Sequence, residues 1–90
     1  MYEISYSNQF GKDLKLAAKR GFDIDQLRDV IKNLQESGKL HSRYRTHKLH
    51  GQFNNYLECH IKSDWLLIWK QEDTSKKIIL TRTGTHTDLF

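Results

Sequence analysis

The stretch 58–83, ECHIKSDWLLIWKQEDTSKKIILTRT, decides the fold of this 90-residue chain. Apolar and polar residues alternate along 53–61, which is the period of a strand with one buried face. Residues 65–70 are apolar on both faces, as in a central strand, and residues 77–83 are rich in Ile, Leu and Thr, which favour strands. The sequence therefore predicts a three-stranded antiparallel meander, with the polar stretch 71–76 as a hairpin loop. The first of these strands should bury Phe53, Leu57, Cys59 and Ile61.

The first twenty residues predict a strand followed by an amphipathic helix. Apolar residues alternate with polar ones over 2–6, as in a short half-buried strand. Ser7 or Asn8 can cap the helix that follows, and Gly21 can supply the left-handed residue that ends it. The apolar face of this helix should consist of Phe10, Leu14, Ala17 and Ala18.

A second amphipathic helix is predicted between Asp23 and Gly38. Asp23 followed by Gln26 resembles a capping pair, and apolar residues recur at helical spacing. The order of one strand, two helices and three strands predicts an α+β fold in a single domain, 1–90. The helices should cover one face of the sheet and leave the other face available. The apolar stripe of the second helix is Leu27, Val30, Ile31 and Leu34.

The charge of the chain favours a polyanionic partner. Fifteen Lys and Arg residues against eleven Asp and Glu give a formal net charge of +4, and nucleic acid is the first candidate. The segment 37–57 contains no acidic residue at all. We expect this segment to dock on RNA together with the lysines of the first helix. The cations concerned are Lys12, Lys15, Lys19, Lys39, Arg43, Arg45 and Lys48.

The same composition disfavours a secreted or membrane protein. The single cysteine, Cys59, cannot form an internal disulfide, which indicates a reducing compartment. The longest strongly apolar run, 65–69, is far shorter than the ~20 residues that span a bilayer. We therefore expect a cytoplasmic protein with no membrane association.

Five histidines are the residues most able to carry chemistry. His41 and His50 are interpreted as solvated surface residues. His60 lies on the polar face of a predicted strand, where a rigid element would hold its ring. His86 follows a glycine after a strand that carries Arg82, so an imidazole and a guanidinium can converge at one edge of the sheet.

Metal and nucleophile chemistry are both weaker interpretations of these residues. His47 and His50 lie three apart, and His60 and His86 could complete a set, but there is no second cysteine and no HExxH motif. No glycine elbow surrounds a serine, and Cys59 falls on the apolar side of its strand, so we expect it in the core. We expect no metal and no cofactor.

Histidines and arginines in a basic protein fit metal-independent RNA cleavage, in which the ribose 2′-OH attacks the neighbouring phosphorus. That reaction needs a base, an acid and a cation for the phosphorane charge. Imidazole can serve in both proton roles because its unperturbed pKa is ~6.5, and Arg suits the phosphate. Trp65 and Tyr56 could stack a displaced base, although Trp65 could equally begin the core strand.

Four segments carry a resemblance to a known family: FGKDLKLAAKRGFD at 10–23, HKLHG at 47–51, ECHIKSDWLLIWK at 58–70 and LTRTGTHTDLF at 80–90. The chain resembles the RelE/ParE superfamily of bacterial toxins, and within it the YafQ-like branch. This resemblance implies a ribosome-dependent endoribonuclease that cuts messenger RNA in the decoding site. It also implies that a cognate antitoxin, expected to be acidic, holds the toxin inactive. We expect the free toxin to be a monomer.

The resemblance also implies a set of functional residues. His86 would lead proton transfer, with His60 or His47 as its complement. Asp64 would orient a histidine or assist the 2′-OH, and Arg82 would stabilise phosphate charge. Where relatives often have proline after the first histidine, or before the aspartate, this chain has Lys48 and Ser63. Substrate contacts are expected from Trp65, Phe90, Arg43, Arg45 and Lys48.

Two other functions remain open from the sequence. One is a non-catalytic RNA-binding or ribosome-binding module that uses the same basic surface. The other is a ParE-like toxin directed at DNA gyrase, which would share the fold. The histidine-rich site argues against the gyrase-directed toxin, because such a binder has no need of paired imidazoles.

Overall fold

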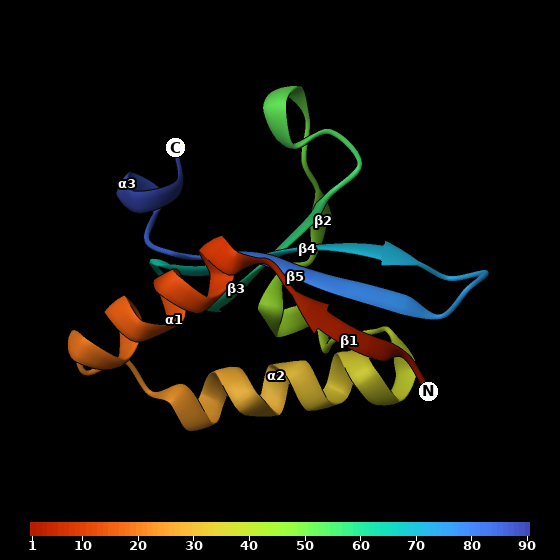
Figure 1. Cartoon of the computed structure of the whole chain (residues 1–90), viewed down its shortest axis with the longest axis horizontal. Coiled ribbons are helices and arrows are strands. Elements are labelled where there is room, and N and C mark those ends of the chain that lie inside the picture. The colour runs from red at the N-terminus through yellow and green to blue at the C-terminus, as the bar shows by residue number, and fades with distance from the viewer.

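A five-stranded sheet with two helices on one face organises the chain, and the computed structural model describes all of residues 1–90 (Figure 1). The spatial order of the strands is β1-β5-β4-β3-β2. The prediction of an α+β fold is confirmed. The elements are β1 (Glu3–Tyr6), α1 (Asn8–Lys19), α2 (Ile24–Ser37), β2 (His47–Lys48), β3 (Leu57–Lys62), β4 (Trp65–Glu72), β5 (Lys77–Gly84) and α3 (His86–Leu89), with 3-10 turns at Ser42–Tyr44 and Gly51–Phe53.

The predicted meander forms the centre of the sheet. β3, β4 and β5 pair in antiparallel fashion, and β1 adds to the outer edge of β5 in parallel. The sequence did not indicate β2, which contributes only two residues and pairs with the start of β3. Because β2 is so short, the rest of that edge of β3 stays unpaired, and this open edge lies beside the candidate site.

α1 begins and ends where the sequence predicts, but its buried face differs in one position. The Ser7 hydroxyl accepts a hydrogen bond from the Phe10 amide at 3.0 Å, and Gly21 follows the helix at φ +81°. Ala18, expected on the apolar face, is exposed, while Asp13 is buried in its place. A carboxylate can be buried at this position only because both of its oxygens accept hydrogen bonds there.

α2 is capped at both ends by the predicted residues. The Asp23 side chain accepts from the Gln26 amide, although the Gln26 side chain donates to the Ile61 carbonyl at 3.0 Å instead of completing a capping box. Gly38 ends the helix in the left-handed conformation at φ +71°. A Cβ at Gly38 would lie only 2.6 Å from the Tyr2 ring, so the turn is also tightly packed.

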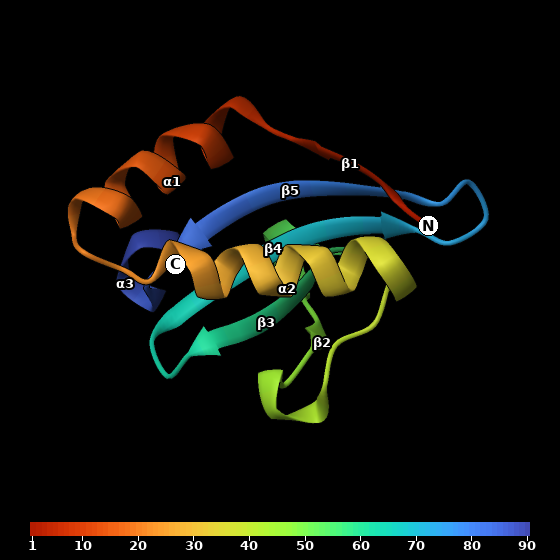
Figure 2. The same cartoon turned by 90° about the horizontal axis from the view of Figure 1, so that it is seen from below.

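The main core lies between the sheet and the two helices, and Figure 2 views the sheet from the helix side. Trp69 and Leu67 of β4 are buried at its centre. The pleat that points these side chains at the helices also sends Cys59 of β3 into the core, as predicted. No helix in the structure has the length and the apolar character needed to cross a bilayer.

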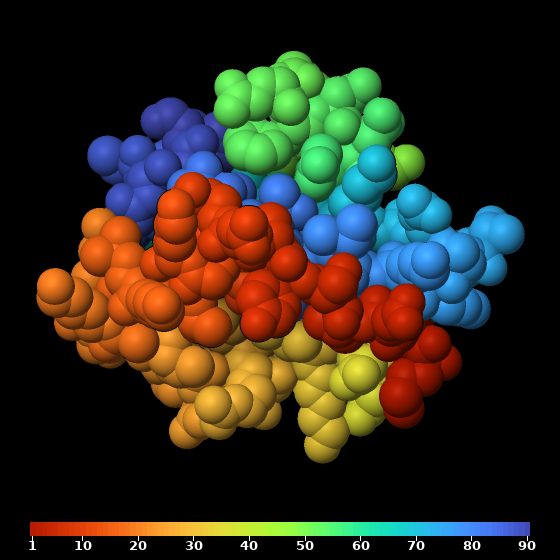
Figure 3. All heavy atoms as spheres, viewed as in Figure 1, coloured from red at the N-terminus to blue at the C-terminus, as the bar shows by residue number.

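The opposite face of the sheet is partly covered, which the sequence did not predict. Leu66 and Ile68 of β4 pack there with Leu89 of α3, next to Phe53. Phe53 was expected in a strand facing the main core, but it lies in a 3-10 turn and β3 begins only at Leu57. Figure 3 shows the segment around residue 50 (green) beside the C-terminal end (dark blue) on this side of the molecule.

Candidate active site

Three histidine rings lie in a row on the face of the sheet away from α1 and α2. The ring centroids of His47 and His60 are 6.2 Å apart, and those of His60 and His86 are 5.8 Å apart. His47 comes from β2, His60 from β3 and His86 from the start of α3. Residues that lie between 13 and 39 positions apart in the sequence thus form a single cluster, and a carboxylate stands at each end of it.

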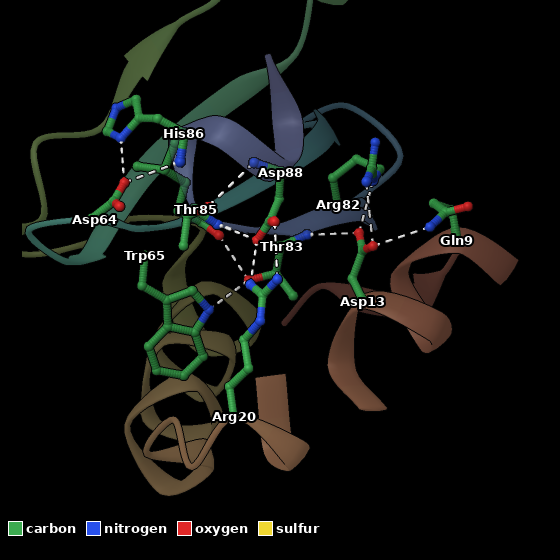
Figure 4. A network of polar contacts seen from close by, with 11 residues as sticks. Gln9, Asp13, Arg20, Asp64, Trp65, Arg82, Thr83, Thr85, His86 and Asp88 are labelled. Atoms are coloured by element: carbon green, nitrogen blue, oxygen red, sulfur yellow. Dashed lines mark hydrogen bonds and ion pairs between the residues drawn. The ribbon is translucent and has the colours of Figure 1, made fainter. Parts of the chain in front are cut away.

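Asp64 holds the ring of His86 at one end of the row (Figure 4). Its Oδ1 accepts from the His86 backbone amide at 3.0 Å and contacts the ring Nδ1 at 2.7 Å. These two contacts, the backbone one first, lower the pKa of Asp64, so the carboxyl group is ionised at neutral pH. A charged acceptor fixes the Nδ1 hydrogen on His86 and leaves Nε2 free to exchange a proton.

Glu58 holds His47 at the other end of the row. The Glu58 Oε1 lies 3.1 Å from the His47 Nε2, and the Arg45 carbonyl lies 2.9 Å from the Nδ1. Both nitrogens of His47 therefore already have protein partners. Glu58 is only 4% exposed, and its Oε2 has no hydrogen-bond partner. The sequence placed Glu58 on the same strand face as His60 but gave no reason to select it.

The ring of His60 makes no hydrogen bond to the protein, although the hydrogen-bonded imidazoles of His47 and His86 lie on either side of it. The strand holds its backbone and the neighbouring rings confine its side chain, which is half-buried. Both of its ring nitrogens are therefore open to a ligand. In the row, the free sites for proton exchange are His60 and the Nε2 of His86.

Arg82 does not converge with His86, contrary to the expectation from the sequence. Its Nε lies 2.7 Å from the Oδ2 of Asp13 on α1, and its Nη2 lies 3.3 Å from the other oxygen. Gln9 and the Thr83 amide also donate to Asp13. Figure 4 shows the guanidinium directed toward Asp13 and away from His86. The buried carboxylate attracts the cation, which retains only Nη1 without a protein partner.

Trp65 is a core residue, so the expectation that it contacts the substrate is corrected. Its side chain is 3% exposed, its Nε1 donates to Thr83 Oγ1 at 2.9 Å, and its ring packs against Phe22. A base could stack on this ring only if the core opened. Burial of Trp65 at the start of β4 is the other interpretation that the sequence allowed.

The remaining predicted contacts divide between two surfaces. Arg43 and Arg45 line a cleft of about 540 Å³ at the open edge of β3, together with His60 and Lys62. Phe90 is 65% exposed and packs edge-on against Phe53 at a centroid distance of 5.8 Å.

Lys48 lies apart from these residues, and its contact with the substrate stays a prediction. Strand pleating turns it to the face opposite His47, where it lines another cleft with Lys70 and Asp73.

Metal ligation and thiol chemistry find little support in this geometry. No three His, Cys, Asp or Glu side chains converge as a metal ion would need. Cys59 is buried, and this burial raises its pKa to about 12. The thiol is therefore protonated at neutral pH and cannot serve as a nucleophile.

Comparisons with known proteins place the chain in a family. Residues 2–90 match the family described as "Bacterial toxin of type II toxin-antitoxin system, YafQ". The chain is 39% identical over 89 residues to the mRNA interferase toxin YafQ of Escherichia coli K12, with 98% of this chain and 95% of that protein covered.

Two similar solved structures extend the comparison to the fold. The toxin in the crystal structure of the E. coli DinJ-YafQ complex has a TM-score of 0.90 at 38% identity, covering 100% of this chain and 99% of that one. A metal-bound toxin from Helicobacter pylori has a TM-score of 0.90 at 38% identity, with both chains covered over 100%. With this fold and this match along its whole length, the chain belongs to the YafQ family of type II toxins.

Proposed function

We propose that the protein is an endoribonuclease that cleaves messenger RNA on the ribosome by metal-independent acid–base catalysis. The observation that carries the proposal is the row of three imidazoles with a carboxylate at each end. Two proton carriers close together are what a 2′-OH attack on phosphorus requires. The name of the E. coli relative, an mRNA interferase, agrees with this chemistry.

His86 and His60 are the proposed proton carriers. Neutral imidazole removes the 2′-OH proton as the oxygen attacks phosphorus, and imidazolium supplies a proton to the departing 5′ oxygen. Asp64 keeps the Nδ1 hydrogen of His86 in place and stabilises the ring when Nε2 is protonated. His47 is a weaker candidate for proton exchange, because both of its nitrogens already have partners.

The phosphate needs cations, and the structure offers them at two places. Arg43, Arg45 and Lys62 lie along the cleft next to His60, where they can follow the RNA backbone. Arg82 can offer its Nη1 and the second N–H of its Nη2, because Asp13 accepts from the Nε and from one N–H of the Nη2. Phe90 is exposed beside this face and can stack on a base.

Ribosome docking and an antitoxin belong to the same proposal. The acid-free segment 37–57 and the exposed lysines of α1 form the surface proposed to bind ribosomal RNA in the cytoplasm. The antitoxin is proposed to be acidic and to cover part of this basic surface. Support for such a partner comes from the E. coli relative, whose structure was solved as a DinJ-YafQ complex.

The proposal is tested by inducing the protein in cells and sequencing the new 5′ ends of transcripts relative to the reading frame. Wild type should produce new ends inside translated regions, and His86→Ala should not. Lys32→Ala is the control, because Lys32 is exposed on α2 and lies outside the proposed RNA-binding surface. Growth arrest without new ends in the wild type would instead indicate a non-catalytic binder.

A further inference from the structure

α3 carries His86 but is too short to hold its own position. Its four residues make barely one turn, and an isolated turn is unstable in water. A capping box closes its first turn, with the Thr85 amide donating to Asp88 Oδ2 at 2.9 Å and the Asp88 amide donating to Thr85 Oγ1 at 3.2 Å. These bonds order the turn internally, so its orientation on the rest of the protein must come from other contacts.

Arg20, at the end of α1, makes such a contact with Asp88 (Figure 4). Its Nη1 lies 2.6 Å from Asp88 Oδ2 and its Nη2 lies 3.2 Å from Oδ1, which is a bidentate pair. The side chains are 38% and 23% exposed, so the pair is partly shielded from water. The hydrogen bonds from Arg20, and then from the Thr85 amide, hold the pKa of Asp88 well below the ordinary carboxyl value.

The end of β5 leaves little room for Asp88 to move. A Cβ placed on Gly84 would lie 3.0 Å from the Asp88 Cβ and from its Oδ2, so the side chain packs against the strand backbone. One carboxylate thus joins three elements: its own turn, the end of β5 and the end of α1. His86 lies two residues before it in the same turn.

We propose that Arg20 and Asp88 are a positioning pair that holds α3 on α1 and thereby keeps His86 in line with His60. Neither residue touches the reacting atoms. The effect on cleavage rate rests on the proposed nuclease function, whereas the attachment of α3 to α1 does not depend on it. Breaking the pair should let the turn open more often and should slow the step that His86 performs, without weakening RNA binding.

The test uses Arg20→Met, Arg20→Lys and Asp88→Asn in the full chain. Amide hydrogen exchange by NMR should be roughly two- to fivefold faster in Arg20→Met at three of the hydrogen-bonded amides of the turn, with no change in β4, as expected for a partly exposed ion pair. Single-turnover cleavage should slow about tenfold at an unchanged Kd for the ribosome complex, because the ring is misplaced and not removed. The amides to follow are those of His86, Leu89 and Phe90.

Matched variants separate positioning from general stability. Arg20→Lys should recover part of both effects, and Arg20→Met should add little in the Asp88→Asn background, where the pair is already broken. Arg28→Met removes the exposed Arg28–Asp25 pair of α2 and should change neither measurement.

Two results would overturn the positioning pair. One is unchanged exchange in the turn of Arg20→Met, and the other is equally faster exchange throughout the sheet. If the wild type cleaves no message, the nuclease proposal fails, and the exchange comparison alone then decides on the pair.

Discussion

His86 is the residue on which the proposed chemistry depends most. Its Nδ1 is tied to Asp64 and its ring is more than half exposed, with a side-chain exposure of 54%. Removing one general acid or base typically lowers the rate by ~10² to 10⁴, while an exposed substitution changes stability by under ~0.5 kcal/mol. His86→Ala should therefore fold and bind the ribosome normally but fail to cleave. Single-turnover cleavage within about threefold of wild type would exclude this role.

At the scale of single residues, the sequence identified the histidines but not all of their partners. His47, His60, Asp64 and His86 were each selected, and the structure brings them into one cluster. Glu58 was passed over because a glutamate on the polar face of a strand is ordinarily exposed. Its burial depends on β2 and on the turn before β3, which no local pattern predicts.

At the scale of elements, the attachment of α3 should make stability depend on pH. The pKa of Asp88 in the folded protein lies below the ordinary value of ~3.9. Ionised Asp88 therefore stabilises the fold at pH values above ~3.9, and this stabilisation is lost as the pH falls through the folded-state pKa. The stability advantage of wild type over Asp88→Asn should be constant from about pH 5 to 8 and shrink below about pH 4. The difference in free energy of unfolding between the two proteins is measured by urea unfolding at each pH. An advantage that stays constant or grows toward acid would contradict the assignment.

The turn after α2 gives a second prediction at this scale. Gly38 and Gly21 both adopt positive φ, at +71° and +81°, but only Gly38 is crowded by the Tyr2 ring. An alanine at either position should cost about 1 kcal/mol from backbone strain. Gly38→Ala should cost clearly more, because β1 must move to accommodate the new methyl group. Urea unfolding of both variants provides the comparison, and equal losses would show that the contact with Tyr2 is relieved without cost.

Local signals predicted elements better than they predicted what each face buries. Ser7 and Asp23 were found from capping chemistry, which depends on residues three positions away. Asp13 was missed because its partner Arg82 lies 69 positions along the chain. Phe53 was misplaced because the alternation of apolar residues continued past the true start of β3, while Asn55, at φ +74°, interrupts the extended chain.

At the scale of the whole molecule, charge should govern docking on the ribosome. Each phosphate contact made by a Lys or Arg adds roughly 0.7 to 0.9 to the slope of log affinity against log salt. Arg43→Glu and Arg45→Glu should each flatten that slope by about this amount. The control is Lys32→Glu, which changes an exposed cation on α2 outside the proposed surface. An unchanged slope for the arginine variants in a ribosome pelleting titration would remove them from the docking surface.

Contacts between distant elements also explain why some features of the site could not be predicted from the sequence. The order of the elements predicted the sheet, but not that Arg82 would turn toward α1 or that Trp65 would be enclosed by Phe22. Both outcomes depend on how the helices lie across the sheet. The resemblance to the family named candidate residues along the chain, and only the packed structure separates those facing the row from those in the core.

The most direct test of the proposed chemistry is the identity of the ends left by cleavage. Metal-stripped toxin should be mixed with intact ribosomes carrying a defined message at fixed magnesium, since chelation would itself dissociate the ribosomes. Attack by the 2′-OH predicts a 2′,3′-cyclic phosphate or 3′-phosphate on one product and a 5′-hydroxyl on the other. A message with 2′-O-methyl at the scissile nucleotide should resist cleavage. Products with a 5′-phosphate, or cleavage that returns only when zinc, copper or manganese is added back, would contradict the histidine mechanism.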